Sequence, residues 1–187
     1  MTTTTTPVDN GVDVAFLQGA REMLGAEPAG AKFQWRVTNT WVHGTHSEST
    51  TEGYFGLGEE QSRKKEFHFD GDHPELFASE DKGATPTEIL LVALASCLTA
   101  GVATIAQNRE IQLRSVTATV QGDMDVRGVL GVDSDVRNGF SNIKVTYAID
   151  ADASHDDIEA LVAQSQKRSA VYDIVANPTN VVVAVNK

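Results

Sequence analysis

The segment from Thr85 to Ala106 constrains the fold more than any other part of the chain. Side chains from Ile89 to Ala106 are apolar almost all round. Thr85 suits the N-cap of a helix, Pro86 the first helical position and Glu88 the third, which together form a capping box. The pattern therefore predicts a long helix that begins at Pro86. A helix that is apolar all round belongs in the middle of a core, so other segments must cover it.

Strand-like runs are grouped on both sides of this helix instead of alternating with helices. Three runs precede it, over residues 33–42, 48–57 and 65–69. Two runs follow it, and the chain then continues with an amphipathic helix and an unbroken Val/Ala strand, over residues 113–126, 141–149, 153–169 and 180–185. Strands that come in runs favour an α+β fold with a mainly antiparallel sheet.

The 187 residues are enough for one domain with a sizeable core. Residues 1–10 are rich in Thr, Pro, Asn and Asp, which bury too little to offset the entropy of ordering them, so we expect a disordered tail there. Residues 12–24 carry apolar side chains at helical spacing and predict an N-terminal helix. We therefore expect a single domain over residues 11–187, with this helix as an extension.

The charge balance excludes two classes of partner. The chain has 15 Lys and Arg against 26 Asp and Glu, which gives a net charge of −11. Such a chain repels phosphate backbones, so we expect no nucleic-acid partner and no docking on anionic membranes. We find no apolar run approaching the roughly 18 residues that a membrane span needs, and the N-terminus lacks the basic and apolar regions of a signal peptide. The expected location is the cytoplasm.

Cys97 is the only cysteine, which excludes an intrachain disulfide and a cysteine-rich zinc site. It is either a small buried hydrophobe or a reactive thiol. A reactive thiol needs a cation or a helix N-terminus that lowers its pKa. Cys97 lies too far inside its own helix to use that helix's dipole, so an Arg or His would have to come from elsewhere. Glu88 precedes Cys97 by nine residues, about 900° of helix, and therefore faces away from it.

The histidines form two loose groups. His43 and His46 lie in a predicted turn, and a second group lies at a strand end, namely His68, Asp70, Asp72 and His73. Neither group has the His and Glu spacing on a helix that is typical of a zinc motif. We interpret them as exposed turn histidines and a solvated acidic loop, and we expect no metal and no cofactor.

The segment from Ala84 to Cys97 resembles the hallmark of the OsmC/Ohr family, the osmotically inducible and organic hydroperoxide resistance proteins. In that family a proline opens a buried helix and the peroxidatic cysteine follows eleven residues later, the spacing of Pro86 and Cys97. The resemblance extends over residues 33–185. It implies an α+β, OsmC-like fold in which mainly antiparallel sheets wrap around long buried central helices in an intertwined homodimer.

The resemblance also implies roles for individual residues. Cys97 corresponds to the nucleophile, Ser169 occupies the position of the family's second, resolving cysteine, and Thr87 occupies the position of its glutamate. The family's arginine comes from an N-terminal hairpin, whose turn here, Val42 to His46, has no arginine; Arg36 lies nearby in a predicted strand.

Two hypotheses follow from these matches and departures. The first is an OsmC-like thiol redox protein, a thiol-dependent peroxidase that reduces organic hydroperoxides through a single cysteine with an external thiol. The alternative is a non-catalytic OsmC-fold homodimer that binds a small apolar ligand, with Cys97 structural. The departures at Ser169 and Thr87 and the missing arginine favour the alternative, and the family likeness favours the first.

Overall fold

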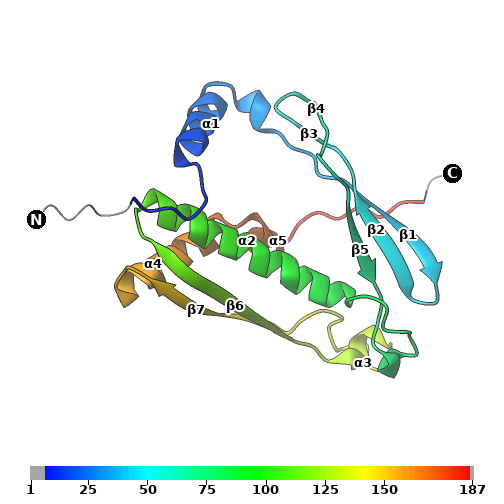
Figure 1. The fold of residues 1–187 in the computed structure, drawn as a ribbon. Coiled ribbons are helices and arrows are strands. Elements are labelled where there is room, and N and C mark those ends of the chain that lie inside the picture. The colour runs from blue at the N-terminus through cyan, green and yellow to red at the C-terminus, as the bar shows by residue number, and fades with distance from the viewer. Residues whose placement is uncertain (1–6, 186–187) are drawn as a thin grey trace, which may run out of the picture. The chain divides into compact units, whose positions relative to one another are not determined.

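The computed structural model describes residues 7–185 (Figure 1). The chain divides into two compact units. We call residues 13–90 the sheet unit, and residues 91–185 with residues 7–12 the thiol unit. Helix α2 (Pro86–Asn108) begins in the first and continues through the second. The expectation of a single domain over residues 11–187 stays a prediction.

The sheet unit is mainly antiparallel. It begins with helix α1 (Val14–Ala26), capped by the Asp13 carboxylate, which accepts a hydrogen bond from the Phe16 N–H. Strand β2 lies between two neighbours in a three-stranded sheet, and β3 and β4 form a separate hairpin. The remaining elements are η1 (Pro28–Ala31), β1 (Val37–His43), β2 (His46–Thr51), β3 (Tyr54–Gly56), β4 (Glu59–Gln61), β5 (Phe67–Gly71) and η2 (Glu75–Phe77).

The run predicted as one strand over residues 48–57 is two strands, β2 and β3. The break falls at Gly53, where a Cβ atom would lie 2.7 Å from the Gln61 carbonyl oxygen. That approach is closer than any side chain allows, so the chain can turn here only with glycine. The hairpin places Tyr54 beside Trp35, with ring centroids 4.6 Å apart.

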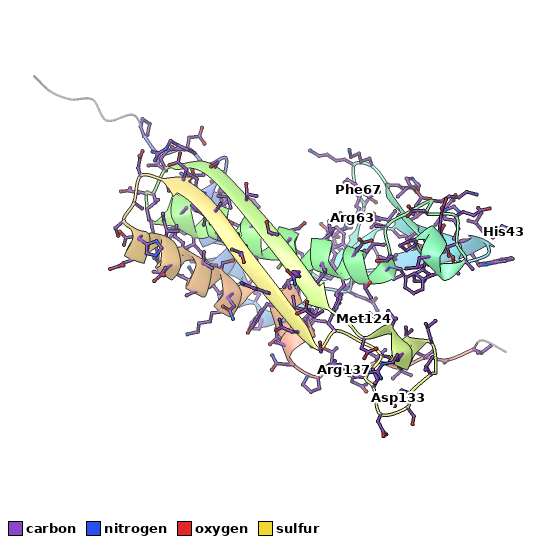
Figure 2. The ribbon with its side chains drawn as sticks, turned by 90° about the horizontal axis from the view of Figure 1, so that it is seen from below. His43, Arg63, Phe67, Met124, Asp133 and Arg137 are labelled. Atoms are coloured by element: carbon purple, nitrogen blue, oxygen red, sulfur yellow. The ribbon has the colours of Figure 1, made fainter. Side chains whose placement is uncertain are left out.

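Arg63 joins this hairpin to the main sheet through aromatic contacts. Its guanidinium lies 5.6 Å from the Tyr54 ring centroid and 5.7 Å from that of Phe67. Figure 2 shows Arg63 and Phe67 next to each other. Contacts of a cation with aromatic faces at this distance are attractive, so the segment between β4 and β5 is held although it has no regular structure.

Asp72 follows β5 and is only 1% exposed. Its carboxylate accepts hydrogen bonds from the Thr45 hydroxyl at 2.6 Å and from the Lys82 N–H at 3.0 Å. These two hydrogen bonds, with a smaller contribution from the His73 N–H, outweigh burial and hold the pKa of Asp72 well below its usual range. The prediction of a solvated acidic loop is thus wrong for Asp72, because its carboxylate is buried and hydrogen-bonds the loops around it.

The thiol unit is a long strand pair packed on helices. It contains α2, β6 (Leu113–Asp123), α3 (Val126–Val129), β7 (Asn142–Ala151), α4 (His155–Arg168) and α5 (Ala170–Ala176). Strands β6 and β7 are antiparallel, and both views show them running alongside α2 (Figures 1 and 2). The segment that connects them carries Met124, Asp133 and Arg137 (Figure 2). The α+β class with antiparallel sheets is therefore confirmed.

The core of the thiol unit lies along one face of α2. The buried side chains recur at helical spacing, namely Leu94, Leu98, Val102, Ile105 and Ala106. Ile105 and Ala106 pack against Leu161 of α4. Gly101 lies on the same side, where a Cβ atom would overlap the Ser165 hydroxyl. The opposite face is open in this chain, since Val92 is 61% exposed. The expectation of a helix buried all round therefore holds for one face only within a single chain.

The apolar character of α2 corrects the expectation that no segment is apolar over the length of a membrane span. Its most apolar 18-residue window has a mean hydropathy of 2.3, so the helix is long and apolar enough to cross a membrane by length and composition. Alanine, glycine, serine and threonine between the large side chains hide this property from a search for uninterrupted apolar runs. The core helix of a soluble protein can be as long and as apolar as this.

The two ends of the described chain differ from the predictions. Residues 1–6 of the expected disordered tail lie outside the described residues. Asn10, in contrast, is tied down: its side chain hydrogen-bonds the Ile111 carbonyl at 2.8 Å and the Leu113 N–H at 2.9 Å. The strand predicted over residues 180–185 is wrong, because residues 177–185 form no regular element. A strand needs a neighbour for its hydrogen bonds, and none of the described strands pairs with this segment.

Candidate functional site

Cys97 lies in α2 and is half-buried. Its sulfur accepts a hydrogen bond from the Ser169 hydroxyl, with 3.1 Å between Oγ and Sγ. Ser169 is the residue between α4 and α5, and it is only 6% exposed. The structure therefore brings together two positions 72 residues apart that the sequence singled out, the candidate nucleophile and the position of the resolving cysteine.

The Ser169 hydroxyl is oriented by a second hydrogen bond. As the N-cap of α5, its oxygen accepts from the Tyr172 N–H at 3.1 Å. An N-cap side chain normally satisfies such a free amide at the start of a helix. The hydroxyl proton is then left to point at Cys97 Sγ. The backbone N–H groups of Ala170 and Val171 also lower the pKa of this thiol, so three uncharged groups from one short segment favour its charged form.

These donors determine the ionisation of the thiol. Burial, the largest single effect, raises the pKa of Cys97. The hydrogen bonds from Ser169, Val171 and Ala170 together outweigh burial, so the pKa lies below that of an ordinary cysteine. Hydrogen bonds to the charged form favour that form. The requirement for an Arg or His that we inferred from the sequence was too narrow, because neutral N–H and O–H groups lower this pKa.

The residues at the beginning of α2 form the predicted capping box. The Glu88 N–H donates to the Thr85 hydroxyl at 3.2 Å, and the Thr85 N–H donates to the Glu88 carboxylate at 2.9 Å. Hydrogen bonds from the Thr85 backbone and then its side chain hold the pKa of Glu88 below its usual value. Thr87, at the position of the family's glutamate, hydrogen-bonds Thr85 through its hydroxyl at 3.2 Å. The capping assignment is confirmed.

Arg36 has a different partner from the one that a peroxidase site would need. Its guanidinium binds both carboxylate oxygens of Glu60, at 2.7 and 2.8 Å. Bidentate pairing of this kind fixes the planar guanidinium group. Arg36 is therefore engaged with the β3–β4 hairpin.

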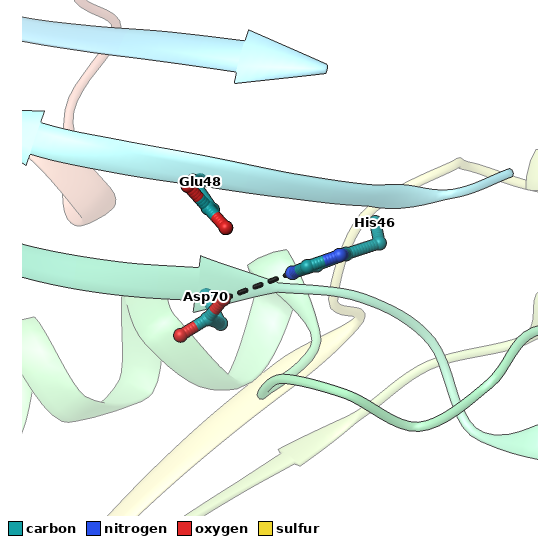
Figure 3. A group of neighbouring side chains, drawn as sticks. All are labelled: His46, Glu48 and Asp70. Carbon is teal, nitrogen blue, oxygen red and sulfur yellow. Dashed lines mark hydrogen bonds and ion pairs between the residues drawn. The ribbon is translucent and has the colours of Figure 1, made fainter. Parts of the chain in front are cut away.

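A second group of chemically active side chains lies in the sheet unit. His46 is buried, 8% exposed, and its Nε2 atom lies 2.9 Å from Asp70 Oδ1. Glu48 joins them (Figure 3), and one ligand atom from each residue lies within 4.8 Å of the others. The interpretation of His46 as an exposed turn histidine is wrong. The signal we missed is the i, i+2 spacing of His46 and Glu48 on one strand, because its meaning depends on the pairing of β2 with β5.

A family model described as OsmC-like protein matches residues 79–184, more than half of the chain. The protein belongs to this OsmC-like family, and the resemblance drawn from the segment Ala84 to Cys97 is confirmed. The match includes α2 with Cys97 and the Ser169 segment. Among curated proteins none matches this chain.

Solved structures show the same fold. An OsmC-like protein from Mycoplasma pneumoniae is 18% identical, with a TM-score of 0.59 over 76% of this chain and 87% of its own. An OsmC-like protein of unknown function from Vibrio cholerae is 11% identical, with a TM-score of 0.54 over 75% and 92%. An organic hydroperoxide resistance protein from Elizabethkingia anophelis is 12% identical, with a TM-score of 0.51 over 75% and 86%. The OsmC-like fold class is thereby confirmed.

Proposed function

We propose that this protein is a thiol-dependent peroxidase of the OsmC-like family, which reduces organic hydroperoxides through Cys97 and is regenerated by an external thiol. The observation that carries the proposal is the half-buried Cys97 sulfur with hydrogen bonds from Ser169, Ala170 and Val171, which lower its pKa. A thiolate is the nucleophilic form of cysteine. The hydroperoxide resistance protein with a similar fold supports the class of substrate.

The proposed reaction has three steps. The Cys97 thiolate attacks the terminal oxygen of the hydroperoxide, the O–O bond breaks, and the alkoxide leaves and takes a proton to become an alcohol, while the sulfur becomes a sulfenic acid. An external thiol then attacks this sulfur, which releases water and forms a mixed disulfide. A second external thiol reduces the mixed disulfide and restores Cys97. Because residue 169 is serine, no step uses an intrachain disulfide.

The proposal includes a cytoplasmic homodimer. The support for a homodimer is the open face of α2, where the apolar side chain of Val92 is 61% exposed. A second copy of the chain would cover this face and remove apolar surface from water. Sedimentation at micromolar concentration should then give about twice the chain mass of 20.1 kDa. A monodisperse monomer would contradict this part of the proposal.

Mass spectrometry after treatment with an organic hydroperoxide tests the chemistry. We expect one added oxygen on Cys97, or a mixed disulfide when a small thiol is present, and neither in Cys97→Ser. If Cys97 stays unmodified in excess hydroperoxide while the protein remains folded, the peroxidase proposal fails. The alternative, a non-catalytic homodimer that binds a small apolar ligand and uses Cys97 structurally, would then be preferred.

The pH profile of Cys97 alkylation tests the proposed activation. The pKa of Cys97 is lowered, so the thiol should begin to react at lower pH than a free cysteine. Ser169→Ala removes one donor to the charged form and should move the profile to higher pH. Ser169→Thr keeps a hydroxyl and serves as the matched control. An identical profile for Ser169→Ala and the unmodified protein would exclude the hydroxyl as an activating group.

A further inference from the structure

We propose that His46, Glu48 and Asp70 form a binding site for a divalent transition-metal ion, with Zn²⁺ as the preferred occupant. The site belongs to the sheet unit and uses none of the residues around Cys97. It rests on the register of two strands, on the placement of charges and on the burial of His46.

The pairing of β2 with β5 places the three side chains on one face of the sheet. Glu48 pairs directly with Asp70 in the antiparallel register. Side chains directly opposite each other point to the same side of a sheet, and residues two apart on one strand do so as well. His46 therefore shares the face of Glu48 and Asp70. Figure 3 shows the imidazole and both carboxylate groups directed toward a common space.

The facing negative charges of Glu48 and Asp70 favour the binding of a cation. Two carboxylates directly opposite each other on neighbouring strands destabilise the pairing. Among the residues that the structure describes, no Lys or Arg forms an ion pair with Glu48 or Asp70, and His46 is the partner of Asp70. A divalent ion between the two carboxylates would replace their repulsion by two attractive contacts.

The His46 side chain and the backbone of Asp70 are held in place before any metal arrives. The His46 side chain is only 10% exposed, whereas that of Asp70 is 53% exposed. Gly83 packs against the backbone of Asp70 so closely that a Cβ atom at Gly83 would overlap it. One ligand is thus fixed by burial and one strand position by packing, while the exposed carboxylate groups can rotate to complete the site.

The distances fit a metal ion after a small rotation of one side chain. Zinc bonds to histidine nitrogen and carboxylate oxygen at about 2.0–2.2 Å, so two ligand atoms can lie no more than about 4.4 Å apart. The present ligand atoms lie within 4.8 Å of one another, and His46 Nε2 and Asp70 Oδ1 are only 2.9 Å apart. The metal would take the place of the proton that these two atoms share. Nitrogen and oxygen donors together suit zinc better than magnesium or calcium.

Zinc binding should be measured by titration of the full chain with ZnCl₂ in competition with a chromophoric chelator. We expect one equivalent of Zn²⁺ per chain. Glu48→Gln and Asp70→Asn, both at exposed carboxylates of nearly unchanged shape, should each weaken binding at least about tenfold. Zn²⁺ should also raise the melting temperature of the unmodified protein more than that of either variant, because a ligand that binds only the folded state stabilises it.

Two controls distinguish this site from other zinc ligands. Cys97→Ser removes the thiol, and His155→Gln removes an exposed histidine that pairs with Glu159 at 3.2 Å on α4. Both variants should keep the affinity of the unmodified protein. The proposal is overturned if no saturable equivalent binds, if Glu48→Gln and Asp70→Asn leave the affinity unchanged, or if Cys97→Ser removes the binding.

Discussion

The environments of Cys97 and of His46 differ in how they stabilise negative charge. Around Cys97, uncharged donors from the beginning of α5 converge on a half-buried sulfur and lower its pKa. Around His46, two carboxylates face each other across paired strands, and no Lys or Arg among the described residues neutralises them. Neutral N–H and O–H groups can thus stabilise a charge without a counter-ion, whereas of the two facing carboxylates only that of Asp70 has an ion-pair partner, His46, among the described residues. The first arrangement suits a nucleophile and the second a cation.

The substitution Ser169→Cys should have the largest effect, because it changes the chemistry qualitatively. The hydroxyl lies 3.1 Å from Cys97 Sγ, so a thiol at this position is placed to attack a sulfenic acid on Cys97. We expect treatment with a hydroperoxide to give an intrachain disulfide, detected as the loss of two hydrogens by mass spectrometry, and no adduct with an external thiol. Ser154→Cys, at the other end of α4, is the control and should form no intrachain disulfide. A Ser169→Cys protein that still accumulates adducts would contradict the contact between the two segments.

Gly101→Ala tests how tightly the helices behind Cys97 are packed. A methyl group here would overlap the Ser165 hydroxyl, which donates to the Leu98 carbonyl at 2.6 Å. Overpacking of this kind costs about 1–3 kcal/mol of unfolding free energy, measured by chemical denaturation. Gly19→Ala in α1, where the same methyl meets no atom within 4 Å, should instead stabilise by about 0.5–1 kcal/mol. Equal effects of the two substitutions would mean that α2 and α4 do not pack as described.

Glu88→Ala separates capping from catalysis at the beginning of α2. Loss of the capping box should cost about 0.5–2 kcal/mol of stability and leave the oxidation rate of Cys97 nearly unchanged. Because the pKa of Glu88 is lowered in the folded protein, its contribution is present at neutral pH and is lost as the pH falls through that lowered pKa. Melting curves and thiol oxidation rates on one variant decide the question. An unchanged melting temperature with a large loss of rate would assign Glu88 a catalytic role.

The smallest effect is expected in the metal-free sheet unit. Glu48→Gln removes one of two facing carboxylates and should raise the stability of the metal-free protein by about 0.2–1 kcal/mol. Glu66→Gln, an exposed carboxylate 3.8 Å from His68, is the matched control and should not stabilise the protein. A loss of stability in Glu48→Gln would show that this side chain has a favourable partner at neutral pH.

The sequence predicts features whose determinants lie close together in the chain. The capping box needs only Thr85 to Glu88, and the family motif needs only the continuous segment from Ala84 to Cys97, so both could be recognised. The position of Ser169 could be inferred from the family likeness, but its hydrogen bond to Cys97 could not, because that contact depends on how α4 and α2 pack.

Features that depend on strand register or on a partner strand could not be predicted. The meeting of His46 with Asp70 requires the exact pairing of β2 with β5, and a shift of one residue would place them on opposite faces. The segment over residues 180–185 has a strand-like composition, but composition says nothing about whether a neighbouring strand is present. The partners in the hydrogen bonds that tie down Asn10 lie about one hundred residues further along the chain.

The Ser169 hydroxyl serves two structures at once, and this links the state of the sulfur to a helix. It donates to Cys97 Sγ and accepts from the Tyr172 N–H in the first turn of α5. An oxygen added on the side of the sulfur that faces this hydroxyl would displace the hydroxyl, and the first turn of α5 would then lose its cap. We therefore expect oxidation to loosen α5, with faster amide hydrogen exchange at Tyr172 as its signature. Oxidation of Cys97 Sγ would then change the stability of a backbone segment that does not itself react.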